Sequence, residues 1–100
     1  MSLQLHSDIK LENVVLDKDG NAMLIDFGAA FEFDSKNTSV YTGRLVGTSC
    51  YWAPECYLGC YSPASDMWAL GLLTCCLLTG FAPDPNIKSS SQANIFLSKM

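Results

Sequence analysis

Residues 6–13 read HSDIKLEN, and most of what this sequence predicts depends on how they are interpreted. The stretch holds the only histidine of the chain, His6, followed by Asp8, Lys10 and Asn13. Together these side chains could accept a proton, carry positive charge and bind a cation. Any one of them taken alone is more often simply part of a solvated surface loop. The choice between the two interpretations depends on the segments that follow.

The overall composition is that of a single globular unit. Apolar residues make up 49% of the 100 residues and charged residues 16%, so one hydrophobic core is expected. The formal net charge is −4 and the lysines and arginine are scattered, which argues against binding to nucleic acid through its phosphates.

No membrane segment is expected. The apolar run MWALGLLTCCLLTGFA, residues 67–82, is shorter than the roughly 20 residues that a membrane span requires, so it predicts a buried helix. The first residues show no charged leader followed by an apolar core, so no secretory signal is expected.

The cysteines indicate a reducing compartment. There are five, an odd number, and they lie in apolar or helical surroundings rather than in the regular spacing of a disulfide framework. We therefore expect an intracellular, cytoplasmic protein, with the nucleus left open.

Two short runs after the opening stretch predict a β-hairpin. NVVLD (13–17) and AMLID (22–26) flank KDGN, a turn that contains glycine. Antiparallel pairing would place Asn13 beside Asp26, which ends the second run. Carboxylate and amide oxygens are ligands that Mg²⁺ accepts, so this convergence predicts a magnesium site.

The sequence contains four motifs in this order: HSDIKLEN (6–13), DFG (26–28), GTSCYWAPE (47–55) and DMWALG (66–71). In this order and spacing they resemble the catalytic loop, the magnesium motif, the end of the activation segment and the start of the central helix of eukaryotic protein kinases. The resemblance covers roughly residues 3–85, nearly the whole chain.

The resemblance implies an α+β fold that is part of a kinase C-terminal lobe. Residues 1–100 would form a partial catalytic domain, with a catalytic loop at 6–13, an activation segment at 26–55 and a buried central helix at about 65–79. Further short helices are expected near 54–58 and 91–99.

By the same resemblance, four residues would carry the chemistry of a kinase that uses ATP and Mg²⁺. Asp8 would be the base that accepts the proton of the substrate hydroxyl, and Lys10 would stabilise the phosphoryl group during transfer. Asn13 and Asp26 would bind the magnesium ion. ATP and a protein substrate would be the partners of the complete enzyme.

Other matching residues would support these four. The family stacks the residues at the His6 and Phe27 positions in a hydrophobic column, and Gly28 completes the magnesium motif. Asp66 is at the position that binds the backbone of the catalytic loop, and Glu55 ends the activation segment.

Two positions bear on the substrate. Lys10 and Thr48 resemble the serine/threonine-directed branch of the family, because the tyrosine-directed branch usually carries other residues at both places. The subfamily stays open.

One departure from the family concerns regulation. Arginine usually precedes the catalytic aspartate, but here the residue is Ser7, so the cation that would bind an activation-segment phosphate is missing. We therefore expect that phosphorylation does not switch this segment in the usual way. Its candidate acceptors are Ser35, Thr38, Ser39, Tyr41 and Thr42, with Arg44 as an alternative phosphate partner.

A second departure concerns the small lobe. The seven glycines contain no G-x-G pair, and no lysine or arginine precedes Lys10. The glycine-rich loop and the strand lysine of the N-terminal lobe are therefore absent, and we expect a fragment that is inactive alone. The alternative is a non-catalytic kinase-like fragment that binds a protein partner through exposed apolar surface.

Other chemistries fit less well. Cys56 and Cys60 offer only two zinc ligands, with no second pair or histidine near them in the sequence. No G-x-S-x-G motif of a hydrolase occurs.

Overall fold

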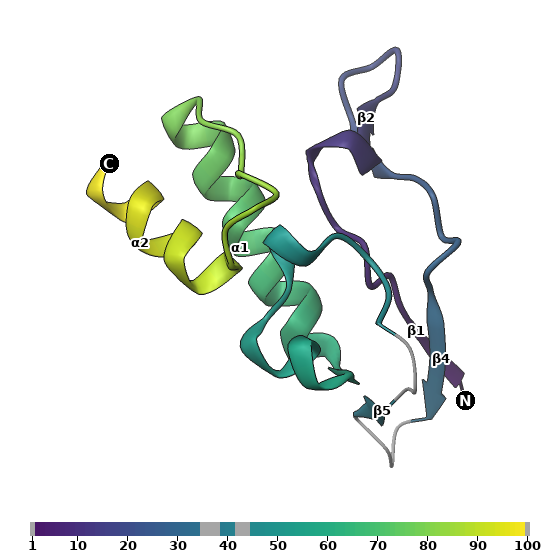
Figure 1. Ribbon diagram of the computed structural model, residues 1–100. Helices are drawn as coiled ribbons and strands as arrows, with labels where there is room; N and C mark the ends of the chain where they lie inside the picture. The colour runs from purple at the N-terminus through teal and green to yellow at the C-terminus, as the bar shows by residue number, and fades with distance from the viewer. Residues whose placement is uncertain (1, 35–38, 42–44, 100) are drawn as a thin grey trace.

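The computed structural model describes residues 2–34, 39–41 and 45–99. Five of the six described strands lie in the first half of the chain and both α-helices in the second. The strands are β1 (Ser2–Leu5), β2 (Val14–Leu16), β3 (Ala22–Leu24), β4 (Phe31–Asp34), β5 (Val40–Tyr41) and β6 (Cys60–Tyr61). The helices are the 3₁₀ turns η1 (Leu11–Asn13), η2 (Ser49–Tyr51) and η3 (Pro54–Leu58) and the α-helices α1 (Pro63–Thr79) and α2 (Ser89–Ser98). The β1–β4 pair and the β2–β3 hairpin lie on the side of the molecule away from α2 (Figure 1). The fold is α+β, as the sequence predicted.

The predicted hairpin is present, with shorter strands than expected. β2 pairs antiparallel with β3, and Val14 lies opposite Leu24. In the turn, Gly20 has a φ of 83° and the Asp17 carboxylate accepts the backbone N–H of Asn21 at 2.9 Å. This hydrogen bond lowers the pKa of Asp17. The residues that form this turn are neighbours in the sequence, so the hairpin could be predicted from the sequence.

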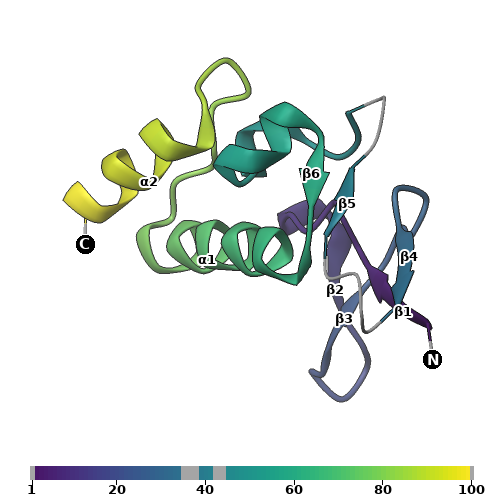
Figure 2. The same ribbon diagram turned by 90° about the horizontal axis from the view of Figure 1, so that it is seen from below.

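Two further strand pairs were not predicted. β1 pairs antiparallel with β4, with Leu5 opposite Phe31, and β5 pairs with β6 in the same sense. The β1–β4 pair joins the chain just before residue 6 to the chain just after the DFG triplet. Figure 2 shows this pair beside the β2–β3 hairpin, on the side of the molecule away from α2. The segment between the paired strands is therefore held at both ends.

Helix α1 begins and ends with clear local signals. Pro63 occupies its first turn, and the Ser62 N–H donates to the Ser65 hydroxyl at 2.9 Å. Gly80 ends the helix with a φ of 76°, a conformation that glycine adopts without strain. Its observed range, Pro63–Thr79, starts two residues before the expected 65–79 because proline is well tolerated at a helix start.

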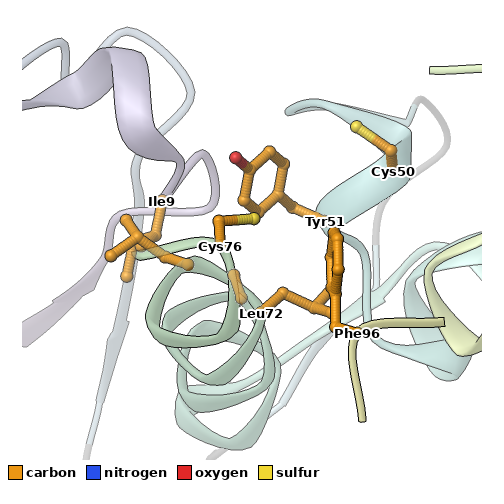
Figure 3. Close-up of a cluster of buried hydrophobic side chains, with 8 residues drawn as sticks. Ile9, Cys50, Tyr51, Leu72, Cys76 and Phe96 are labelled. Atoms are coloured by element: carbon orange, nitrogen blue, oxygen red, sulfur yellow. The ribbon is translucent and has the colours of Figure 1, made fainter. Parts of the chain in front are cut away.

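The core is built around one face of α1. Figure 3 shows Leu72 and Cys76 of this helix beneath the Tyr51 ring, with Ile9 on one side and Phe96 of α2 on the other. A second, smaller cluster contains Leu5, Ala53, Cys56 and Tyr61. The first cluster therefore joins the 6–13 segment, η2 and both α-helices.

The central helix is not buried on all sides. Leu77 is 67% exposed and Leu78 71% exposed, whereas Leu72 on the opposite face is 3% exposed. The expectation of a buried helix is thus correct for one face only, because the described residues provide too few apolar side chains to cover the other. Among the described residues, no helix has the length and apolar character needed to cross a membrane.

All five cysteines lie in the described part of the chain and are free thiols. Cys50, Cys56 and Cys76 are buried, and burial raises the pKa of each thiol. A buried thiol with a raised pKa is a poor nucleophile, so these three residues act in packing.

We predict that Leu72→Ala lowers the free energy of unfolding by about 2–5 kcal/mol, because the substitution leaves a cavity in the core. Leu78→Ala, on the exposed face of the same helix, should change it by less than about 0.5 kcal/mol. Urea denaturation followed by tryptophan fluorescence measures both. Equal losses in the two variants would contradict the assignment of the core to one face of α1.

Candidate functional site

The Asp8 carboxylate is the centre of a polar network that joins two distant segments. One of its oxygens, Oδ1, accepts the Thr48 hydroxyl at 2.8 Å. The Lys10 ammonium lies 4.0 Å from the other, Oδ2, and donates to the Thr48 hydroxyl oxygen at 2.9 Å. Three side chains thus fix one another, and the side chains of Asp8 and Lys10 remain 16% and 22% exposed. The network holds the carboxylate in place and leaves it partly accessible.

Asn13 supports this network from within the same segment. It is 5% exposed, and its amide nitrogen donates to the Asp8 backbone oxygen at 2.9 Å and lies 3.4 Å from Asp8 Oδ2. Because the nitrogen is used in this way, the amide oxygen of Asn13 is left for another partner.

The Asp66 carboxylate anchors the start of the segment to α1. Its two oxygens accept the backbone N–H groups of His6 and Ser7 at 2.9 and 3.1 Å. Hydrogen bonds to an ionised group are stronger than those between neutral groups. Ser7 has a φ of 67°, a left-handed conformation that costs energy for a residue other than glycine. The two bonds to Asp66 offset that cost and set the direction in which the chain enters Asp8.

The His6 ring connects the segment to the end of the hairpin. The Asp8 N–H donates to its Nδ1 at 3.1 Å, so Nδ1 carries no proton in this arrangement. Nε2 is then the donor to the Ile25 carbonyl oxygen at 2.9 Å. The ring also packs edge to face against Phe27, with centroids 4.8 Å apart. His6 therefore acts as a spacer between Asp8 and the DFG triplet.

Asp26 directly follows Ile25, which pairs with Asn13 through the backbone. The Ile25 N–H donates to the Asn13 carbonyl oxygen at 2.9 Å, as hairpin pairing predicts. Asp26 is exposed, has a φ of 61°, and accepts the Gly28 N–H at 3.3 Å. Among the described residues, no hydrogen bond joins Asn13 to Asp26. The backbone nevertheless brings the two residues close together, as hairpin pairing predicts.

The donor set at this end of the hairpin fits a magnesium ion. The Asn13 amide oxygen and the Asp26 carboxylate are hard oxygen ligands, and Mg²⁺ takes one or two such ligands from a protein. The described residues contain no group of three or more histidine, cysteine, aspartate or glutamate side chains arranged to hold a metal. Any metal bound here would need further ligands from water or from phosphate.

The other predicted residues are placed as follows. Glu55 lies half-buried in η3, away from the Asp8 network, and has no ion-pair partner in the described part of the chain. Ser39 and Tyr41 are exposed. Ser35, Thr38, Thr42 and Arg44 lie outside the described residues.

The sequence interpretation missed one residue of the site and one interaction. Gly47 has a φ of 88°, and a side-chain carbon there would collide with the Ser7 carbonyl oxygen. Only glycine permits this close approach. The position of Gly47 directly before Thr48 could have indicated such a contact from the sequence. Thr48 was interpreted as a marker of substrate class, whereas it also bonds both Asp8 and Lys10.

Comparison with known proteins identifies similar sequences. The family model of the protein kinase domain matches residues 3–100. A Caenorhabditis elegans protein provisionally named as a serine/threonine-protein kinase is 44% identical over 92 residues, which cover 91% of this chain and 20% of the relative. The Arabidopsis thaliana serine/threonine-protein kinase AtPK1/AtPK6 is 38% identical over 97 residues, or 96% of this chain and 20% of the relative. Cyclin-dependent kinase C-2 of Arabidopsis thaliana is 39% identical over 92 residues, which cover 90% of this chain and 18% of the relative. The chain spans about a fifth of the length of these curated relatives.

We predict that Asp66→Asn lowers the free energy of unfolding by about 1–3 kcal/mol, because one of the two backbone N–H groups loses its acceptor. The amide protons of His6 and Ser7 should also exchange faster with solvent. Asp84→Asn is the matched control, since Asp84 accepts a single exposed N–H from Asn86 at 2.9 Å. Hydrogen exchange measured by NMR tests both variants, and unchanged exchange at His6 and Ser7 would contradict the anchoring role.

Proposed function

Because this chain belongs to the protein kinase family, we propose that residues 6–13 are the catalytic loop of a protein serine/threonine kinase. The reaction would move the terminal phosphoryl group of ATP to a serine or threonine hydroxyl of a protein. The activity is proposed for a protein that contains these residues together with the rest of a kinase domain. The observation that carries the proposal is the Asp8 network with Lys10 and Thr48.

In this proposal Asp8 is the base. The substrate hydroxyl oxygen bonds to the terminal phosphorus, the bond from that phosphorus to the leaving ADP breaks, and the hydroxyl proton passes to the Asp8 carboxylate. Two features support the role. Thr48 fixes one carboxylate oxygen at 2.8 Å, and the side chain stays partly exposed, so a substrate can reach it. A positioned base of this kind typically contributes about 10²–10⁴-fold to the rate.

Lys10 would stabilise the negative charge of the transferring group. Its ammonium lies 4.0 Å from Asp8 Oδ2 and is oriented by the Thr48 hydroxyl. A cation held next to the base acts on the phosphoryl oxygens without reorganising during the reaction. The Lys10–Thr48 hydrogen bond also supports the serine/threonine-directed branch, in line with the names of the relatives.

Asn13 and Asp26 would hold the magnesium ion, with residues 26–28 as the magnesium motif. When bound, Mg²⁺ neutralises negative charge on the phosphates of ATP. The exposed Asp26 carboxylate and the remaining amide oxygen of Asn13 are suited to this role. His6, Phe27 and Gly28 would orient the two ligands. Residues 26–55 would be the activation segment, which Glu55 closes.

A second candidate function is a protein-interaction module without catalysis. One observation favours it: Leu77, Leu78 and Leu97 are each more than half exposed, and an apolar groove of about 240 Å³ lies between α1 and α2. Exposed apolar patches of this kind commonly mark contact surfaces. The two candidate functions differ in whether residues 6–28 take part in phosphoryl transfer.

We predict that Asp8→Asn, in a protein with a complete kinase domain, lowers kcat by about 10²–10⁴-fold, because asparagine cannot accept the proton. Asp19→Asn changes an exposed turn residue of the hairpin and should leave kcat unchanged. Transfer of labelled phosphate to a serine/threonine substrate measures both. A kcat near the wild-type value in Asp8→Asn would overturn the proposed base.

The 100 residues alone should transfer no phosphate, because their sequence holds neither a G-x-G pair nor a lysine before Lys10. The same assay on the purified chain tests this expectation, with Asp8→Asn as the background. Magnesium-dependent transfer clearly above that background would contradict it and would exclude the purely non-catalytic module.

A further inference from the structure

The hydroxyl of Ser7 is a buried polar group that the proposed chemistry does not use. Ser7 is 9% exposed, and its Oγ finds no hydrogen-bond partner among the residues that the structure describes. Its backbone is fixed on both sides, by the Asp66 bond to its N–H and by Gly47 against its carbonyl oxygen. The position of the Ser7 backbone is therefore fixed, and only rotation about the Cα–Cβ bond moves the hydroxyl. Buried hydroxyls in folded proteins are nearly always paired, with protein or with ordered water.

A small, partly open space is lined by Ser7. Its walls come from the 6–13 segment, from the chain between Thr48 and β6, and from the first turns of α1. The serine, threonine and aspartate side chains that line it are Ser7, Asp8, Thr48, Ser65 and Asp66. The volume open to the centre of a water-sized sphere is about 10 Å³. This is close to the smallest volume that holds one water molecule and is too small for two.

The polar atoms of the walls suit a single water. Each Asp66 oxygen accepts one backbone N–H and can accept a second hydrogen bond. The Ser65 hydroxyl already bonds Ser62, and the Thr48 hydroxyl already bonds Asp8 Oδ1. Much of the remaining wall is apolar or aromatic. A metal ion would need about six oxygen ligands, which these walls do not supply. One serine hydroxyl and one carboxylate meet the minimum of two partners that a buried water requires.

We infer that this cavity binds one structural water molecule, hydrogen-bonded to the Ser7 hydroxyl and to the Asp66 carboxylate. The water would add a third link between the 6–13 segment and α1, beside the two direct bonds that Asp66 already accepts. It would satisfy the Ser7 hydroxyl at the position where related kinases usually carry arginine. The site does not depend on phosphoryl transfer, so it can be tested whether or not the chain is part of an active kinase.

Nuclear Overhauser spectra between water and the labelled full chain test the site. In the wild-type chain we expect a long-lived water signal at the protons of Ser7, and in Ser7→Ala its loss together with a lower melting temperature. Ser89→Ala is the matched control, because Ser89 is buried but its hydroxyl already bonds the Trp52 carbonyl oxygen. That variant should keep the water signal.

Three results would overturn the inference. The first is the absence of a long-lived water at Ser7 in the wild-type chain, which needs no variant to fold. The second is an unchanged water signal in Ser7→Ala. The third is a higher melting temperature in Ser7→Ala, because removal of an unpaired buried hydroxyl relieves a cost, whereas removal of a water-paired one does not.

Discussion

The Asp66 carboxylate accepts two consecutive backbone N–H groups, and the arrangement of the site depends on this interaction. It fixes the strained conformation of Ser7 and thereby the direction in which Asp8 projects. Its own position is set by α1, whose start is specified by Pro63 and the Ser62–Ser65 contact and whose inner face is packed in the core. Asp66 thus ties the polar start of the loop to the helix against which Ile9 of the same loop packs.

Two further links bring separate parts of the chain to the same loop. Thr48 reaches Asp8 across 40 positions of sequence, and His6 reaches the Ile25 carbonyl across 19. Each link uses one hydrogen-bonding group, so the site is sensitive to small changes in the surrounding backbone. Close packing at Gly47 holds the first link, and the edge-to-face contact with Phe27 holds the second. This rigidity is what a reaction that depends on positioning requires.

The sequence predicted features whose causes are local and missed those whose causes are distant. The β2–β3 hairpin was predicted from the glycine turn between two apolar runs, and α1 was predicted from the apolar run at 67–82. Pro63, which sets the observed start of α1, was not used. The β1–β4 pair could not be foreseen, because β1 is a four-residue strand whose partner begins 26 residues after it ends. The hydrogen bond from the Asn13 amide nitrogen to the Asp8 backbone oxygen was also not predicted. Hairpin pairing predicts the backbone contact of Asn13, whereas this side-chain bond depends on the conformation of the whole loop.

In the proposed function, residues 6–28 hold the magnesium ion and the reacting hydroxyl. The decisive experiment is a crystal structure of a protein with this segment in a complete kinase domain, bound to Mg²⁺ and a non-hydrolysable ATP analogue. We expect the Asn13 amide oxygen and the Asp26 carboxylate to bind the metal while Asp8 keeps its bond to Thr48. A metal bound without either residue, or an Asp8 carboxylate turned away from the nucleotide, would contradict it.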